Sequence, residues 1–272
     1  MMMTKLFEAR YYETYFVANA INNVLVEPFS YLHNLDDFYG ELLYVRFLKP
    51  YQKHSSFHQF IEFVVDSLFY EALDERLEKS DELNELPINL ALRHYKITHQ
   101  SFSEWLNSNS KESKNIDSDA AYSYYSYLKE YDIYNSLLKT IVEEVFFIMF
   151  LNRHSLMLFH KLIADVITSS EIEELKPNDR VWFSNNGILL RKNIPQWAKN
   201  AVFYRDRGRC VLCYMDLSHL LSLQNENHFD HIVPLARGGI NDVTNLQLLC
   251  SDCNYHKSAK DAYTSVMYEK WY

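Results

Sequence analysis

Two Cys-x-x-Cys pairs near the end of the chain constrain its folding more than any other feature of the sequence. Cys210 pairs with Cys213 and Cys250 with Cys253, and residues 1–209 contain no cysteine. A two-residue spacer lets both sulfurs of a pair face one ion, so two such pairs favour a tetrahedral structural zinc. Disulfide bridges and redox chemistry are less favoured. Disulfides are typical of small secreted domains, where they are spread along the chain, and nothing in this sequence suggests secretion. We therefore expect the C-terminal part to be a small zinc-stabilised domain.

The segment around the second pair contains more polar groups than a zinc site needs. Its pattern predicts a strand within residues 227–235, a loop over 236–245, a second short strand over 245–250 and a helix over 253–263. The 36 residues between the two pairs exceed the spacing of an ordinary zinc ribbon. The groups left over for other chemistry are Asp230, His231, Asn245, Asn254 and His256.

The order of these residues carries a resemblance to a known family. C-x-x-C is followed by Asp-His-Ile-x-Pro, Gly-Gly, Asn and then C-x-x-C-Asn-x-x-Lys, within a stretch that includes FDHIVPLARGGINDVTNLQLLCSDCNYHK. This pattern resembles the HNH endonuclease family, whose domain has the ββα-metal fold. The resemblance covers about a quarter of the chain, from Pro195 to Asp261, while residues 1–180 resemble no family. It implies a small α+β domain, and the helical spacing of apolar residues before it predicts a mainly α N-terminal domain.

The resemblance also implies roles for four residues. His231 would be the general base, and Asn245 would steady the loop and the orientation of His231. Asp230 and Asn254 would hold one divalent cation against the scissile phosphate. Many family members have histidine where this chain has Asn254, which gives a His-Asn-Asn triplet. One carboxylate and one amide oxygen suit magnesium or manganese, so we expect metal-dependent hydrolysis of DNA, with RNA not excluded.

Each of these side chains also has a structural alternative. Asp230 could cap a turn, and His231 could be an ordinary surface histidine. Asn254 could be the N-cap of the helix, a role that asparagine favours. His256 lies about 200° around that helix from Asn254, so we expect it to face solvent or a phosphate rather than the metal. His228 is on the Asp230 side of the strand and could support it.

The charge of the chain is divided unevenly. Residues 1–190 contain 17 Lys and Arg against 28 Asp and Glu, while residues 191–272 contain 10 against 8. Binding to phosphates depends on basic side chains that release counterions, so we expect nucleic acid to contact the C-terminal part. The predicted phosphate contacts are Arg205, Arg207, Arg209, Arg237, Lys257 and Lys260. A solvated charged face is the alternative.

The N-terminal part has the pattern of long helices. Residues 57–79 repeat apolar side chains at helical spacing, and residues 120–167 are so long that we expect one bend or break. The tyrosines at 122, 124, 125 and 127 are too dense for one buried face, so some rings should be exposed or at an interface. We therefore predict a partner protein or self-association for this part.

We predict three segments along the chain. Residues 1–176 form a helical regulatory or partner-binding domain, residues 177–193 a β-hairpin connector around Asn186-Gly187, and residues 194–272 the HNH nuclease domain. The most apolar run, residues 145–151, is far shorter than the roughly 20 residues of a membrane helix, and we find no signal peptide. We expect a cytoplasmic protein that does not contact a membrane.

The predicted function is a DNA endonuclease controlled by its helical domain. Weak sequence recognition requires such control, which is typical of bacterial or phage defence systems. Two alternatives stay open at this point. One is a catalytically silent, zinc-stabilised module that binds nucleic acid, and the other is a scaffold subunit of a larger assembly.

Overall fold

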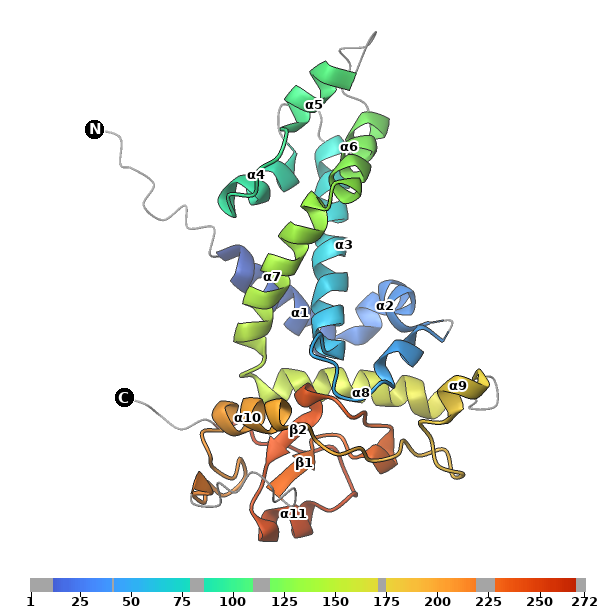
Figure 1. The fold of residues 1–272 in the computed structure, drawn as a ribbon, viewed down its shortest axis with the longest axis vertical. Coiled ribbons are helices and arrows are strands. Elements are labelled where there is room, and N and C mark those ends of the chain that lie inside the picture. Colours follow the sequence, from blue (N-terminus) through green and yellow to red (C-terminus); the bar gives the residue numbers. More distant parts are fainter. Residues whose placement is uncertain are drawn as a thin grey trace, which may run out of the picture. The chain divides into compact units, whose positions relative to one another are not determined.

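The computed structural model describes residues 12–40, 42–78, 86–109, 118–170, 175–218 and 228–267 (Figure 1). The chain forms two compact units. Unit 1 comprises residues 1–20 and 61–145, and unit 2 comprises residues 21–60 and 146–272. Three helices, α1 (Tyr12–Val26), α3 (Ser56–Glu78) and α7 (Ile133–Met149), continue from one unit into the other along the chain.

Unit 1 is helical, as the sequence predicts. Besides its parts of α1, α3 and α7 it contains α4 (Pro87–His94), α5 (Phe102–Asn109) and α6 (Ser118–Glu130). The bounds of α3 confirm the helix predicted for residues 57–79. Helices α3, α6 and α7 lie side by side, joined by contacts between aromatic rings (Figure 1). None of the helices in the described part of the chain is both long and apolar enough to cross a bilayer.

The long apolar stretch of residues 120–167 breaks twice, so the prediction of one break is wrong. The first break separates α6 from α7 at Asp132, whose φ of 60° is left-handed and cannot continue a helix. The second separates α7 from α8 (Arg153–Ser169). There the side chain of Asn152 accepts a hydrogen bond of 3.2 Å from Ser155 N and caps the start of α8.

The tyrosine-rich helix α6 is divided between core and surface. Tyr124 and Tyr125 are completely buried, whereas Tyr122 is 39% exposed, in agreement with the expectation that some rings lie outside the core. The hydroxyl of Tyr124 accepts a hydrogen bond of 2.7 Å from the Asn89 side chain. Burial raises the pKa of Tyr124 to about 12. Most of this group therefore stabilises unit 1, and Tyr122 is its exposed member.

Unit 2 combines short helices with one small sheet. In chain order its described elements, besides parts of α1, α3 and α7, are η1 (Pro28–Tyr31), α2 (Leu32–Tyr39), η2 (Leu43–Phe47), α8, α9 (Pro177–Arg180), α10 (Gln196–Arg205), β1 (Phe229–His231), η6 (Leu235–Arg237), η7 (Val243–Asn245), β2 (Leu246–Leu248) and α11 (Ser251–Lys257). Helix α10 begins directly after Pro195, as predicted. Helices α8 and α10 both lie entirely in this unit with the cysteines.

The segment predicted as a β-hairpin has one antiparallel bridge, between Phe183 and Leu189. Gly187 adopts a φ of 74°, which suits glycine, and Ser184 N donates a hydrogen bond of 2.8 Å to Ile188 O across the turn. The chain therefore reverses direction at Asn186-Gly187, as predicted. The two sides of the turn form one bridge rather than the two extended strands of a regular hairpin.

Residues from the N-terminal part help to build the core of unit 2. Tyr51 is buried in one apolar cluster with Phe229, Leu246 and Leu248, and its backbone N–H donates a hydrogen bond of 2.8 Å to Asn241 O. A compact unit need not fold alone, so the predicted domain boundaries stay a prediction. The packing nevertheless ties residues 21–60 to the C-terminal part of the chain.

Candidate nuclease site

The four cysteines form a cluster of the size that zinc requires. Their sulfur atoms all lie within 4.8 Å of one another, and Cys213 Sγ is 3.6 Å from Cys250 Sγ. Tetrahedral zinc with Zn–S bonds of about 2.3 Å places its sulfurs about 3.8 Å apart. Within the described ranges this is the only group of three or more His, Cys, Asp or Glu side chains close enough for a shared ion. The geometry is therefore consistent with a structural zinc.

Local backbone structure holds each cysteine pair in place. Cys210 N donates to Met215 O at 2.9 Å, which closes a tight turn around the first pair. Cys250 is the N-cap of α11, where its sulfur accepts a hydrogen bond from Cys253 N. Burial raises the pKa of Cys210, but backbone N–H groups outweigh this effect and lower it, whereas burial and the neighbouring thiols raise the pKa of Cys253. Four thiolates at this spacing need a cation among them.

The strands next to this cluster position the predicted catalytic residues. β1 pairs antiparallel with β2, with His231 opposite Leu246 and Asp230 opposite Gln247. Phe229 and His231 are buried and Asp230 between them is half-buried, as alternation along a strand requires. Helix α11 follows β2. It spans residues 251–257 rather than the predicted 253–263, because Ser258 adopts a φ of 52° and ends it.

His231 is a buried, neutral imidazole at the end of β1. Its side chain is almost fully enclosed, and Nε2 has no hydrogen-bond partner among the described residues. Burial, together with the positive charges of Arg191 and Lys257, lowers the pKa of His231 to about 3, although the Asn241 side chain acts in the opposite direction. His231 is therefore not the surface histidine that the structural alternative required.

Asp230 forms a buried ion pair. Its Oδ2 accepts hydrogen bonds of 2.9 Å from Lys257 Nζ and from Gln247 Nε2. Lys257 Nζ also donates to His231 O at 2.8 Å, so α11 and β1 are joined at the candidate site. The ammonium of Lys257 already neutralises the carboxylate that the resemblance assigns to a metal. His228, the possible support of Asp230, instead contacts Leu249 O through Nδ1 at 3.0 Å.

Asn254 lies on α11 one turn before Lys257. Residues three apart on a helix share neighbouring faces, so Asn254 is on the side of α11 that approaches β1. It is half-buried and lines an open depression of about 680 Å³ together with His256 and Lys260. The N-cap alternative is wrong, because Cys250 holds that position. His256 is exposed, as expected.

Asn245 ties together the loop that follows His231. Its Oδ1 accepts a hydrogen bond of 2.9 Å from Val233 N, and its Nδ2 donates to Val233 O and Ile240 O, both at 3.0 Å. Its backbone carbonyl accepts from Ile232 N at 2.6 Å. Asn245 thus connects the residues after β1 to the residues before β2, which supports the predicted steadying role.

The Gly-Gly pair of the motif allows two close backbone approaches. A Cβ on Gly239 would lie 2.0 Å from Val233 O. Gly238 adopts a φ of 82°, and a Cβ there would lie 2.7 Å from Ala164 O on α8. Larger residues would push this loop away from β1 and from α8.

Asp242 is a supporting residue that the sequence prediction missed. Its Oδ2 accepts from Ser56 N at 2.9 Å and from Ser56 Oγ at 3.0 Å, so it caps the start of α3. Its Oδ1 accepts from Thr244 N and Thr244 Oγ1, at 2.8 and 2.7 Å. His160 Nε2 lies 2.8 Å from the same hydroxyl. The Asp-x-Thr spacing is typical of such a turn and could have indicated the local half of this network.

Asn241, the residue before Asp242, was also missed. Its side chain donates to Leu190 O at 2.9 Å and accepts from Lys192 N at 3.2 Å. Asn241 therefore joins the connector to Tyr51, and its side chain also raises the pKa of His231. No local pattern indicates these partners, because they are distant in sequence.

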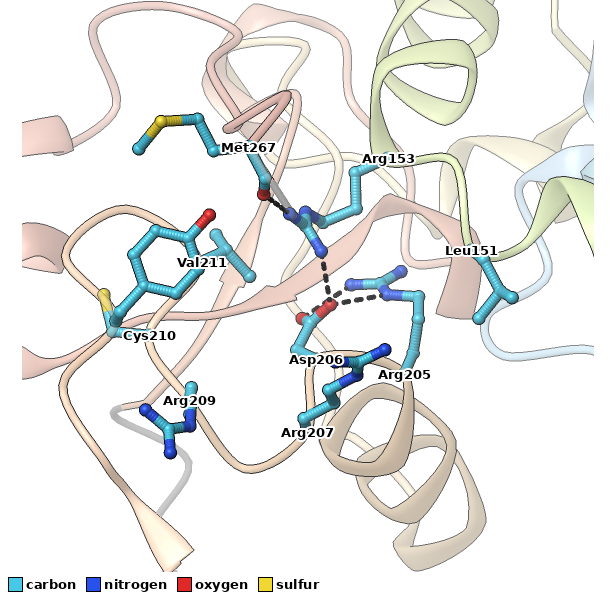
Figure 2. Close-up of a pocket in the computed structure, with 10 residues that line it drawn as sticks. Leu151, Arg153, Arg205, Asp206, Arg207, Arg209, Cys210, Val211 and Met267 are labelled. Carbon is cyan, nitrogen blue, oxygen red and sulfur yellow. Dashed lines mark hydrogen bonds and ion pairs between the residues drawn. The ribbon is translucent and has the colours of Figure 1, made fainter. Parts of the chain in front are cut away.

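The predicted phosphate contacts fall into two groups. Arg205 is buried, binds Asp206 through two hydrogen bonds of 2.8 Å (Figure 2) and donates to Leu246 O at 2.6 Å. Lys257 is buried against Asp230. The other four are at least partly exposed, namely Arg207, Arg209, Arg237 and Lys260. The structure therefore buries Arg205 and Lys257, whereas the other four basic side chains lie at the surface, where Arg237 Nε donates to Lys260 O at 2.9 Å.

Two short antiparallel strands, a helix and a four-cysteine cluster of the size that zinc requires make up a small ββα arrangement. Residues 210–260 match the family model of the HNH endonuclease. That range contains all four cysteines together with Asp230, His231, Asn245 and Asn254. No match was found among curated proteins or among solved structures.

Proposed function

We propose that this protein is a metal-dependent endonuclease that hydrolyses phosphodiester bonds of DNA, with His231 as the general base. The observation that carries the proposal is the imidazole of His231, which is neutral, ends β1 and has an unpartnered Nε2 within the part that matches the HNH endonuclease model. A general base must be unprotonated before it can accept a proton from water.

The low pKa of His231 needs a substrate to be useful for catalysis. A base is most effective when its pKa lies near the working pH, and about 3 is far below it. Burial is the main cause of this low pKa, so the imidazole would have to become more accessible to water and substrate. The anionic phosphate of a nucleic acid would also offset the positive charges of Arg191 and Lys257 and raise the pKa of His231.

Asp230 and Asn254 are the residues that would hold a divalent cation. Their oxygens are hard ligands that suit magnesium or manganese, which would stabilise the charge that develops on the phosphate. Lys257 contacts the same carboxylate at 2.9 Å and occupies part of the space that a metal ion would need. Metal binding therefore requires Lys257 to move aside or to share the carboxylate.

A second function has an observation in its favour. The imidazole of His231 is enclosed and Asp230 is paired with Lys257, as suits a domain that binds nucleic acid without cleaving it. Control by the helical N-terminal part would reconcile cleavage with binding alone. A partner that binds the helical part could expose His231 and release Asp230 from Lys257. A role in bacterial or phage defence and a scaffold role stay predictions.

The test compares plasmid DNA and a matched RNA incubated with the full chain and magnesium. His231→Ala should lower the rate of cleavage by at least about 100-fold, the usual contribution of a general base. His33→Ala is the control, because that histidine is exposed on α2 and has no role in the predicted site, so the variant should keep full activity. Intact DNA with wild type and both variants, together with retained DNA binding, would contradict the nuclease proposal and favour the binding module.

A further inference from the structure

Unit 1 contains an apolar pocket whose lining comes from four of its helices. Residues of α1, α3, α4 and α7 form its walls, and its volume is about 210 Å³ (Figure 1). Phe16 on α1 is part of the lining and is 58% exposed. Leu68 and Phe69 on α3 and Leu90 on α4 also line it and are half-buried. A second apolar group could therefore cover these side chains and remove them from water.

The size of the pocket suits one or two apolar side chains. A cavity of about 150 Å³ with apolar walls binds one benzene ring. A pocket of about 210 Å³ holds a ring of that size together with part of a second side chain. Sites for drug-sized ligands begin at about 300 Å³. The pocket therefore fits the anchoring side chains of a polypeptide better than a free organic molecule.

The architecture of unit 1 favours a helical polypeptide as the ligand. All elements of unit 1 in the described part of the chain are helices, so its described residues include no strand edge. An extended peptide needs such an edge for its backbone hydrogen bonds. A helix satisfies its own backbone and inserts apolar side chains that are three and four residues apart into a groove.

The charge of unit 1 narrows the choice of ligand. Unit 1 contains 10 Lys and Arg against 19 Asp and Glu, a net charge of −9, whereas unit 2 contains 17 of each. Around the pocket, the charged residues of α3, α4 and α7 that lie three or four positions from a lining residue are mainly acidic. The acidic ones are Glu62, Asp66, Glu71, Glu75 and Glu144, and the basic ones are Arg76 and Arg93. Pairing among these residues does not change the balance. A second copy of the chain, a nucleic acid or an anionic membrane would bring like charge to this surface.

One of these carboxylates is held at the edge of the pocket. Glu144 Oε2 accepts a hydrogen bond of 2.8 Å from the hydroxyl of Tyr95, which lines the pocket, and one of 3.1 Å from Thr14 Oγ1. A carboxylate fixed there can pair with a cation of the ligand. The exposed tyrosine that suggested an interface is elsewhere, because Tyr122 is on α6 and donates to Asp74, and neither residue lines the pocket.

We infer that this pocket is the docking site for an amphipathic helix of another protein that has basic side chains beside its apolar face. The apolar anchors of that helix fill the pocket and cover Phe16, and its Lys and Arg side chains face the acidic residues around the pocket. This inference goes beyond the proposed function, because docking requires neither nucleic acid nor cleavage.

The test measures binding of fluorescent peptides of about 18 residues, long enough to form a helix, to the full chain by anisotropy. The first peptide has leucine at positions i, i+3, i+4 and i+7 and lysine on its other face. The second has glutamate in place of each lysine, and the third has the composition of the first in scrambled order. Phe16→Ser is the test variant. Phe29→Ser is the matched control, because Phe29 is 84% exposed in η1 of unit 2 and lies outside the pocket.

Thermal melting verifies that both variants fold. Both rings are largely exposed, so neither replacement should disturb the core. If Phe16→Ser does not fold, Ala72→Gln replaces it as the test variant, because Ala72 lines the pocket from α3 and a longer side chain there fills it.

The lysine peptide should bind the wild-type protein, and the scrambled peptide should not. Phe16→Ser should weaken binding about tenfold through the lost apolar contact, whereas Phe29→Ser should change it by less than about twofold. Binding should also weaken as salt rises from about 50 to about 500 mM. No binding to the wild type, or an equal loss in the two variants, would overturn the inference.

Two further results would overturn the choice of ligand. Equal binding of the glutamate peptide would mean that charge does not select the partner. A wild-type dimer in sedimentation that Phe16→Ser dissociates would mean that a second copy of the chain occupies the pocket.

Discussion

Replacing Asp242 with asparagine tests how far the N-terminal residues support the candidate site. Its carboxylate is buried and accepts four hydrogen bonds of 2.7 to 3.0 Å, two from Ser56 and two from Thr244. Asparagine keeps one acceptor oxygen and replaces the other with an NH₂ group. The two donors that bind the replaced oxygen, from either Ser56 or Thr244, would then face the N–H groups of the asparagine side chain.

The size of the effect follows from the two donors that lose their acceptor. A hydroxyl can rotate away, but the backbone N–H of Ser56 or Thr244 cannot, and one buried unsatisfied donor costs about 1–3 kcal/mol. Loss of the negative charge weakens the bonds that remain, because hydrogen bonds to charged groups are the stronger ones. We expect Asp242→Asn to lower the free energy of unfolding of unit 2 by about 3 kcal/mol.

Urea unfolding followed by tryptophan fluorescence and by zinc release measures this change. Asp165→Asn on α8 is the matched control, because Asp165 is exposed and its replacement should change the free energy by no more than about 0.5 kcal/mol. If Asp242→Asn lowers the free energy of unfolding by less than about 1 kcal/mol, the reasoning is refuted. The carboxylate would then not be the essential acceptor for the backbone N–H groups of Ser56 and Thr244. Cleavage should fall as well, because Asn241, next to Asp242, influences the pKa of His231.

Three further predictions follow from the same contacts. Wild-type protein should contain about one zinc per chain, and Cys250→Ser should lose it with most of the stability of unit 2, as metal analysis and thermal melting would record. Burial lowers the pKa of His231 to about 3 and of His160 to about 4, so below about pH 6.5 the unfolded chain binds more protons than the folded one. The free energy of unfolding should therefore be constant above about pH 7. Below about pH 6.5 each of the two histidines should lower it by up to about 1.4 kcal/mol per pH unit, and His160→Asn should remove the contribution of one of them. Asn254→Ala should raise the magnesium concentration needed for half-maximal cleavage without changing zinc content, and an unchanged magnesium requirement would remove Asn254 from the metal site.

The sequence predicted the parts of the site that depend on short spacings. Cys-x-x-Cys fixes a turn, and Asp-His before Ile-x-Pro fixes a strand end, so the cysteine cluster and the position of His231 follow from local chemistry. The role of Asn245 is similar, since its hydrogen bonds join Val233 and Ile240, both within 12 residues. Such contacts are set by the backbone of a single loop.

The sequence did not predict contacts between distant segments. Composition marked Lys257 as a phosphate ligand, but the fold brings it to Asp230 and buries it. Arg205 was likewise counted as a surface charge, although Asp206 beside it is the carboxylate that it binds. A count of charges says nothing about which of them the fold will pair, and pairing decides whether a lysine or arginine can reach a phosphate.

The same distant contacts give control of the proposed nuclease a physical route. Helix α3 starts at Ser56 on the carboxylate of Asp242 and continues along the chain into unit 1. Asn241 precedes Asp242, and its backbone carbonyl accepts a hydrogen bond from the backbone N–H of Tyr51. A partner that shifts the start of α3 would change the acceptor geometry at Asp242 and in the loop before β2. The proposed site therefore depends on residues 51–60, which belong to the same unit as the nuclease motif.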